Sequence, residues 1–377
     1  MRAGWRDVLL FLGLALTMRG AETHPILAIG SPAPDFALPG VDGQIHRLAD
    51  YATDPVLVIV FTCNHCPIAQ QYEQRIQQLY DDYRGKGVAV VAIEPNAPDA
   101  IRIDELDSTD MSDTLAEMKL RVAFKHLSYP YLYDGATQAV ARAYGPQATP
   151  HVFIFDRTRR LRYEGRIDNS YRIEMVKTHE ARDAIDALLA GKPVAVTHTG
   201  VFGCSTKWKE KEAERIAALI KLDAKPVKLD LATPADLESL RANAGKKLTL
   251  VAFWSTRCER CVSQLADWEA TYEMYSARDF DLVTVATDPL NERAAVEQIL
   301  KHRHISTRNL LLPSGETAAL ARTFDPQWQP ATPYLALVKP DGSIVHGLSS
   351  LDILELRRAI LANIVWEYDG FGRYWTR

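Results

Sequence analysis

Cysteine is scarce in this chain of 377 residues: there are only five, too few to staple a small disulfide-rich fold. Charge of one sign is also lacking, since 44 basic residues stand against 48 acidic ones. Without a basic surface we expect no nucleic-acid partner. No apolar run is long enough to span a bilayer of about 30 Å. The remaining composition is that of a globular protein, 47% hydrophobic and 24% charged, and the length predicts two domains.

The first residues have the layout of an export signal. Two arginines precede an uncharged apolar run from Val8 to Leu16, and Ala21 follows shortly after. We therefore expect residues 1–21 to be a secretory signal peptide, with an uncleaved anchor as the alternative. The sequence predicts an exported, periplasmic or otherwise extracytoplasmic protein whose mature chain has no stable membrane span. Cysteine pairs can form disulfides in such a compartment.

Two Cys-x-x-Cys motifs, 195 positions apart, mark an internal repeat. Each half has the same order of features: an apolar strand, the cysteine motif, a helix, a strand, a helix, a Thr-Pro pair, a hairpin and a final helix. The motifs are Cys63 with Cys66 and Cys258 with Cys261, and the pairs are Thr149-Pro150 and Thr332-Pro333. The spacing predicts a duplicated architecture.

The cysteine spacing indicates redox chemistry. Thiol–disulfide exchange needs one thiolate to attack and a second thiol to resolve the mixed disulfide. With two residues between them, both sulfurs fit on the first turn of one helix, where free N–H groups and the helix dipole stabilise a thiolate. We expect Cys63 and Cys258 to attack, and Cys66 and Cys261 to resolve. A zinc site is disfavoured, because it needs four ligands and the two pairs belong to different repeats.

Both halves resemble the thioredoxin fold. Residues 26–190 resemble the redoxin branch related to peroxiredoxins, with Gly-x-x-Ala-Pro-Asp-Phe from Gly30 and Phe-Thr-Cys-Asn-His-Cys-Pro from Phe61. Residues 228–365 resemble exported thiol–disulfide oxidoreductases, with Phe-Trp-Ser-Thr-Arg-Cys from Phe253. The resemblance implies an α/β protein of two thioredoxin-like domains, each a central mixed β-sheet flanked by helices.

The resemblance also implies how a client would bind. A cis proline at Pro150 and Pro333 would expose the backbone of Thr149 and Thr332 for an extended peptide to pair with. The expected function is electron exchange between the two dithiols, client proteins with cysteines or disulfides, and a thiol electron donor or acceptor. We expect no cofactor beyond the redox-active disulfides Cys63–Cys66 and Cys258–Cys261.

Side chains between the cysteines predict a direction of electron flow. His65 favours a thiolate in the first motif and so the reduced form. In the second motif Glu259 opposes a thiolate and Arg260 favours one. Our hypothesis is that the second domain has the lower reduction potential.

Two other functions stay open. A copper- or thiol-binding chaperone for cofactor maturation would use Cys63, His65 and Cys66, which lie in one loop. Peroxide reduction is disfavoured, because the Pro-x-x-x-Thr-x-x-Cys pattern of peroxiredoxins is absent. Counted back from Cys63, its Thr and Pro positions hold Val60 and Val56; counted back from Cys66, they hold Cys63 and Ile59.

Three further segments complete the chain. Residues 191–227 are expected to form an ordered linker with the fifth cysteine, Cys204, for which redox relay, an intermolecular disulfide, metal binding and plain packing are all open. The acidic insertion from Pro95 to Glu117 is expected to be a solvated loop. Residues 366–377 form an aromatic tail that we expect to dock on a domain surface.

Overall fold

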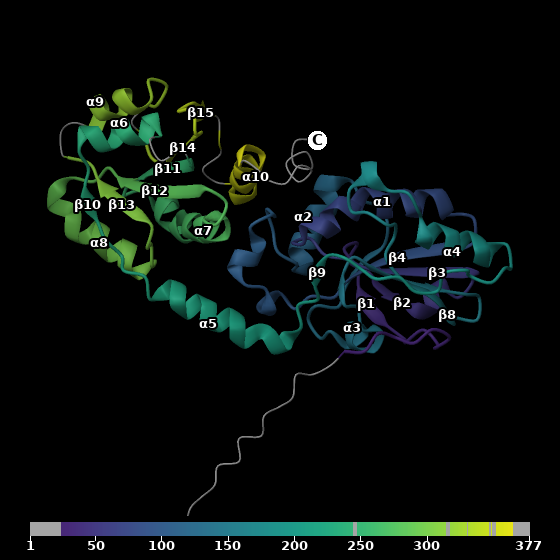
Figure 1. The fold of residues 1–377 in the computed structure, drawn as a ribbon. Coiled ribbons are helices and arrows are strands. Elements are labelled where there is room, and N and C mark those ends of the chain that lie inside the picture. Colours follow the sequence, from purple (N-terminus) through teal and green to yellow (C-terminus); the bar gives the residue numbers. More distant parts are fainter. Residues whose placement is uncertain are drawn as a thin grey trace, which may run out of the picture.

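A computed structural model describes residues 24–243, 247–313, 317–329, 331–346, 348 and 352–364. The expected signal peptide and aromatic tail lie outside these residues. The described chain forms two lobes, and helix α5 (Glu212–Asp223) runs between them (Figure 1). None of the helices in the described ranges is long and apolar enough to cross a membrane.

The first lobe is built around a mixed sheet with the strand order β5-β4-β3-β7-β8. Strands β3, β4 and β5 run parallel, and β7 and β8 are antiparallel to their neighbours. Strands β3 and β4 are buried along their whole length, as expected for a sheet covered on both faces. The strands are β3 (Val56–Phe61), β4 (Val88–Glu94), β5 (Tyr131–Tyr133), β7 (His151–Phe155) and β8 (Leu161–Gly165).

Helices cover the two faces of this sheet through alternate residues of its strands. On one face Tyr72 of α1 and Ile185 of α4 pack against Val58 of β3; on the other, Tyr144 of α3 packs against Ile59. The smaller elements are η1 (Leu48–Tyr51), η4 (Ile173–Met175) and the pair β1 (Ala37–Pro39) and β2 (Ile45–Arg47). The helices are α1 (Pro67–Tyr83), α2 (Leu115–Lys125), α3 (Ala139–Tyr144) and α4 (Glu180–Leu189).

The second lobe repeats this plan with the strand order β10-β13-β12-β11-β14-β15. Helices α7, α8 and α10 pack on one face, and α6 and α9 on the other. Its strands are β10 (Asp230–Leu231), β11 (Leu248–Trp254), β12 (Phe280–Ala286), β13 (Arg308–Leu311), β14 (Tyr334–Val338) and β15 (Ile344–Val345). Its helices are α6 (Pro234–Ala242), α7 (Glu259–Tyr275), η6 (Leu290–Glu292), α8 (Arg293–His302), α9 (Thr317–Phe324) and α10 (Ile353–Asn363). Two mixed sheets flanked by helices confirm the predicted fold class.

The strand register shows that equivalent positions of the two halves are not separated by the spacing of the cysteine motifs. Val56 pairs with Val88 in the first sheet, and Leu248 pairs with Phe280 in the second. These positions are 192 apart, and the following helices α1 and α7 both have 17 residues with the same offset. The two cysteine motifs are 195 apart, so they are not equivalent. Cys66, rather than Cys63, occupies the place of Cys258.

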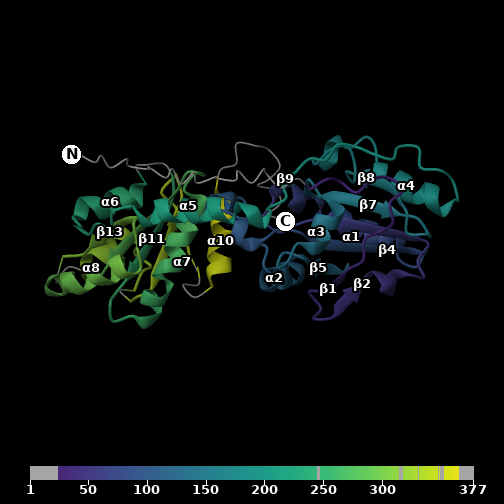
Figure 2. The same cartoon turned by 90° about the horizontal axis from the view of Figure 1, so that it is seen from below.

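The acidic insertion packs between the lobes, so the prediction of a solvated loop is wrong. It contains η2 (Pro98–Ala100) and η3 (Ile103–Leu106), and Ile103 and Leu106 join the hydrophobic core of the second lobe. Arginines of the second lobe bind two of its carboxylates: Arg278 reaches the partly exposed Asp107, and Arg358 reaches the buried Asp110, both at 2.7 Å. Asp99 and Asp104 of the insertion remain exposed. Figure 2 shows α7 and α10 on the side of the second lobe that faces the first.

Candidate active site

The first cysteine motif lies in the loop between β3 and α1. Helix α1 begins at Pro67, so Cys66 is its N-cap residue, and a proline suits the first helical position. Cys63 lies three residues before this cap, outside the helix. The free N–H groups and the dipole of α1 therefore act on Cys66. This corrects the expectation that Cys63 occupies the helix end and attacks.

Three cysteines meet at this helix end. Cys63 and Cys66 are 1% and 0% exposed and pack together with Ala69 and Cys204. The Cys63 sulfur lies 3.0 Å from the Thr149 hydroxyl, and the Cys66 sulfur lies 3.5 Å from the Thr149 carbonyl oxygen. The backbone N–H of Cys204 donates a hydrogen bond of 3.1 Å to the Cys66 sulfur. All three thiols are free.

Their surroundings single out Cys66 as the thiolate. Burial raises its pKa, but hydrogen bonds from Cys204 and Cys63 and the charge of His65 more than offset burial and hold the pKa well below its ordinary value. Burial and the hydrogen bond to Cys66 raise the pKa of Cys63 well above its ordinary value. The hydrogen bond to Cys66 and burial likewise raise the pKa of Cys204. Among the three cysteines, the thiolate form is therefore favoured at Cys66.

Asp113 of the insertion holds the loop that carries these cysteines. Its carboxylate accepts the backbone N–H groups of Asn64 and His65, both at 2.9 Å, and bonds the His65 ring at 2.5 Å. The amide of Asn96 donates to the same carboxylate at 2.9 Å. Burial lowers the pKa of His65, but the charge of Asp113 outweighs it and the net pKa is raised. The Asp113 carboxylate therefore favours the protonated form of His65, the residue next to Cys66.

Sequence reasoning missed the acidic groups beneath this site. Glu94 ends β4, is fully buried and accepts the backbone N–H of Asn96 at 2.8 Å. Burial and the charge of Asp113 raise the pKa of Glu94 well above its usual range. The signal that could have found Glu94 is its position at the carboxyl end of a parallel strand, where functional groups gather.

The first Thr-Pro loop is covered. The Thr149–Pro150 peptide bond is cis, as the resemblance implied. Thr149 is nevertheless only 1% exposed, because β6 (Ala148–Thr149) pairs antiparallel with β9 (Cys204–Ser205), which places Cys204 opposite Thr149. This corrects the expectation of a free Thr149 backbone: a segment of the linker occupies it.

The second motif is open by comparison. Cys258 and Cys261 form a disulfide, Cys258 caps α7, and the N–H of Cys261 donates to its sulfur at 3.1 Å. Cys258 is partly exposed and Cys261 is buried. Thr332 and Pro333, joined by a cis peptide bond, are partly exposed as well. Glu259 and Arg260, the predicted tuning residues of this motif, are exposed on the first turn of the helix.

Comparison with known families identifies both halves. The AhpC/TSA family matches residues 29–164, and the Redoxin family matches residues 222–349. The chain is a tandem of two redoxin-type domains. We call them the AhpC/TSA domain and the Redoxin domain, and the resemblance predicted for both halves is confirmed.

Two curated relatives and a solved structure are similar to parts of the chain. The thiol-disulfide oxidoreductase ResA of Geobacillus thermodenitrificans is 26% identical over 155 residues, which cover 41% of this chain and 79% of that protein. ResA of Geobacillus kaustophilus is 28% identical over 131 residues, 35% of this chain and 65% of that protein. The structure of a hypothetical protein from Sinorhizobium meliloti is 35% identical and covers 49% of this chain and 97% of its own, with a TM-score of 0.44. Both ResA relatives are named thiol-disulfide oxidoreductases, which agrees with the enzyme class predicted from the sequence.

One group in the described part of the chain brings metal-ligand types together. Ligand atoms of Cys63, His65 and Asp113 lie within 4.8 Å of one another in the AhpC/TSA domain. The Asp113 carboxylate already accepts four hydrogen bonds, two from backbone N–H groups, one from the His65 ring and one from Asn96. These bonds account for its position as a loop anchor without an ion.

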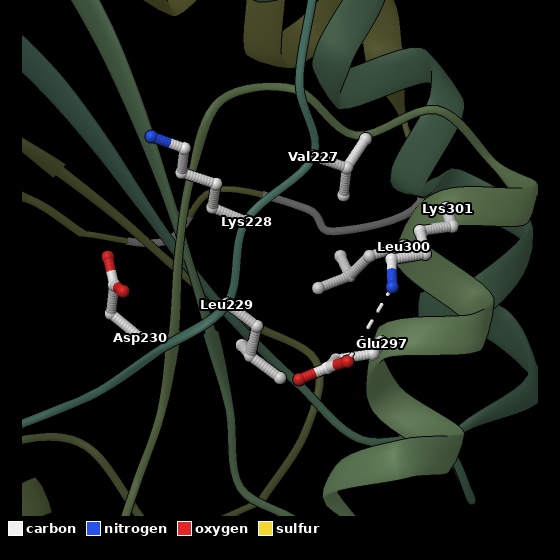
Figure 3. A pocket seen from close by; sticks show the side chains of 7 residues that line it. All are labelled: Val227, Lys228, Leu229, Asp230, Glu297, Leu300 and Lys301. Carbon is white, nitrogen blue, oxygen red and sulfur yellow. Dashed lines mark ion pairs between the residues drawn. The ribbon is translucent and has the colours of Figure 1, made fainter.

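A pocket of about 300 Å³ opens in the Redoxin domain (Figure 3). An ion pair of 3.7 Å between Glu297 and Lys301 lies at its wall. It is lined by residues next to β10 and on α8: Val227, Lys228, Leu229, Asp230, Glu297, Leu300 and Lys301. None of them belongs to a cysteine motif or a Thr-Pro loop, so we assign the active site to the two cysteine-capped helices.

Proposed function

We propose that this chain is an exported thiol–disulfide oxidoreductase that exchanges electrons with cysteines of client proteins and uses no cofactor besides its own cysteines. One arrangement, present in both domains, carries the proposal: a cysteine caps the helix after the central strand and has a second cysteine beside it. Strand register brings a cis Thr-Pro pair to the same end, because Phe61 pairs with His151 and Phe253 with Tyr334. Export rests on the signal-like residues 1–21.

In the Redoxin domain the chemistry follows from the order of the two thiols. The reduced Cys258, stabilised as a thiolate at the N-terminus of α7, attacks a client disulfide and forms a mixed disulfide with one client sulfur, while the other client sulfur leaves as a thiolate and takes up a proton. Cys261 then attacks the Cys258 sulfur, closes the disulfide and releases the second client thiolate, which takes up a proton. The client gains two electrons and the domain loses two. The partly exposed Thr332 backbone is the edge on which an extended client would pair.

A direction of electron flow follows from the local charges. The charge of a protonated His65 lowers the pKa of Cys66, which favours the reduced form of the AhpC/TSA domain and raises its potential. The exposed Glu259 opposes a thiolate in the Redoxin domain and lowers its potential. We propose that electrons pass from the Redoxin domain to the AhpC/TSA domain. Equal potentials would contradict this direction.

The test is the midpoint potential of each centre in the full chain. Replacing both Cys258 and Cys261 by serine isolates the first centre, and replacing both Cys63 and Cys66 isolates the second. Cys204 stays intact in both variants. We expect two reversible two-electron couples and reduction of insulin disulfides by the reduced protein. A centre that does not cycle would contradict the proposal for that domain.

The second candidate is a copper-binding chaperone, which the grouping of Cys63, His65 and Asp113 favours. Copper retained by the purified, reduced protein through dialysis would support it. Peroxide reduction is not proposed despite the AhpC/TSA match. Cys66 caps the helix, and the Thr and Pro positions counted back from it hold Cys63 and Ile59.

A further inference from the structure

The AhpC/TSA domain lacks a resolving thiol where the Redoxin domain has one. Cys261 lies three residues into α7, and the equivalent position of α1 is Ala69. Cys63 occupies the place of Ser255, before the helix. Cys66 therefore depends on a thiol from outside its own helix, and two are within reach: Cys63 from the preceding loop and Cys204 from the linker.

The linker delivers Cys204 in the manner of a bound client strand. Cys204 pairs with Thr149, the residue before the cis proline, where an extended peptide would add to the domain. Gly203 approaches so closely that a Cβ there would lie 2.0 Å from the Thr149 carbonyl oxygen. The next residues are anchored too: Thr206 donates to the carbonyl of Pro146 at 2.7 Å, and Lys207 bonds Glu105 at 2.7 Å. These contacts hold the linker segment against the cysteine site of the AhpC/TSA domain.

We propose that Cys204 is a third redox-active cysteine, which resolves mixed disulfides on Cys66 by forming a Cys66–Cys204 disulfide. The inference rests on the proposed function and names the resolving residue of the AhpC/TSA domain. A client strand and β9 compete for the same edge at Thr149. When β9 pairs again with Thr149, it therefore brings the Cys204 thiol to Cys66 and displaces the client strand in the same movement. Cys63 does not belong to β9, so its attack on the mixed disulfide would not displace the client strand.

The step balances without a further reactant. Cys66 attacks a client disulfide and carries one client sulfur as a mixed disulfide, while the other leaves as a thiolate and takes up a proton. The Cys204 thiol then loses its proton, and its sulfur bonds to the Cys66 sulfur as the bond to the client breaks. The released client sulfur keeps the electron pair and takes up a proton. The client disulfide is reduced to two thiols, and Cys66 and Cys204 are oxidised.

The experiment maps the disulfide that forms in the full chain with Cys258 and Cys261 replaced by serine. The reduced protein is treated with oxidised glutathione, free thiols are alkylated, and the peptides are identified by mass spectrometry without reduction. We expect a Cys66–Cys204 disulfide and an alkylated Cys63. Cys204→Ser should keep glutathione on Cys66 and release it at least about tenfold more slowly. The matched variant Cys63→Ser should still form the Cys66–Cys204 disulfide and so still release glutathione.

The opposite pattern would overturn the inference: a Cys63–Cys66 disulfide with Cys204 alkylated, and glutathione trapped by Cys63→Ser instead. The map of the parent protein decides this even if a variant fails to fold. Failure of the proposed function has a different signature. In that case the parent protein forms neither a mixed disulfide nor an internal one, and the intact Cys258–Cys261 pair does not reduce insulin.

Discussion

Gly203 lies where the chain entering β9 comes close to the backbone of Thr149 when β9 and β6 are paired, an arrangement that we call the closed position of β9. Its φ is +146°, a conformation that residues with a side chain rarely adopt, and an added Cβ would lie 2.0 Å from the carbonyl oxygen of Thr149. The obstacle is backbone, so no side-chain rotation relieves it. Gly203→Ala should therefore move β9 away from Thr149 and uncover Cys66.

The size of the effect follows from the strain. A residue forced into a conformation reserved for glycine costs about 1–3 kcal/mol. If the closed position loses that much, the open population rises about 5- to 150-fold, because 1.4 kcal/mol corresponds to a factor of ten. The alkylation rate of a buried thiol reached only through opening should rise by the same factor.

The assay is the rate at which iodoacetamide modifies Cys66 in the reduced full chain, followed by peptide mass spectrometry. Gly200→Ala is the matched control, since it lies three residues away, has no positive φ and has no atom within 4 Å of its added Cβ. We expect the control to stay within about twofold of the parent protein. Equal Cys66 rates in the two variants would refute the reasoning that β9 gates this thiol.

Four other substitutions test the remaining arguments. Asp113→Asn breaks the buried pair with His65 and should lower the unfolding free energy measured in urea by about 3–5 kcal/mol. Because the pKa of His65 is raised in the folded protein, this loss should be largest below about pH 6.5 and should shrink as the pH rises through the folded pKa. Tyr275→Phe removes a buried hydrogen bond of 2.6 Å to a backbone carbonyl of the insertion and should lower the same free energy by about 1–3 kcal/mol; no change would argue against docked lobes. Glu259→Gln should raise the midpoint potential of the Redoxin domain by about 5–20 mV, and Arg260→Gln should lower it, as exposed charges worth about 0.2–1 kcal/mol predict; shifts of the same sign would contradict the electrostatic account.

The central strands were predictable because an uninterrupted run of apolar residues indicates a strand that is buried on both faces. Val56–Phe61 is apolar throughout, and in the structure it is the buried middle strand of its sheet. The offset between the two cysteine motifs was not predictable, because their identical spacing invites an alignment of Cys63 with Cys258. Strand register alone shows the offset of three residues, since it ties each loop to the helix that follows.

The long-range parts of the site were also beyond sequence reasoning. Asp113 lies 48 residues from His65, and Cys204 lies 138 residues from Cys66. Periodicity reports which residues face a core, but it does not report which distant loop meets a helix end. The acidic insertion shows the same limit: its charge indicated solvent, whereas arginines of the other domain bind Asp107 and Asp110.

That insertion makes the two domains parts of one active assembly. At one end Asp113 fixes the loop of Cys63 and Cys66, and a few residues earlier Thr109 accepts a hydrogen bond from Tyr275, the last residue of the helix that Cys258 caps. Asp110 lies between them and binds both Arg121 of its own domain and Arg358 of the other. Because the same short stretch holds the first thiol loop and the second cysteine helix, a shift of one domain against the other must strain the hydrogen bonds around His65. We therefore expect docking of the lobes to keep the Asp113 carboxylate in place beside His65.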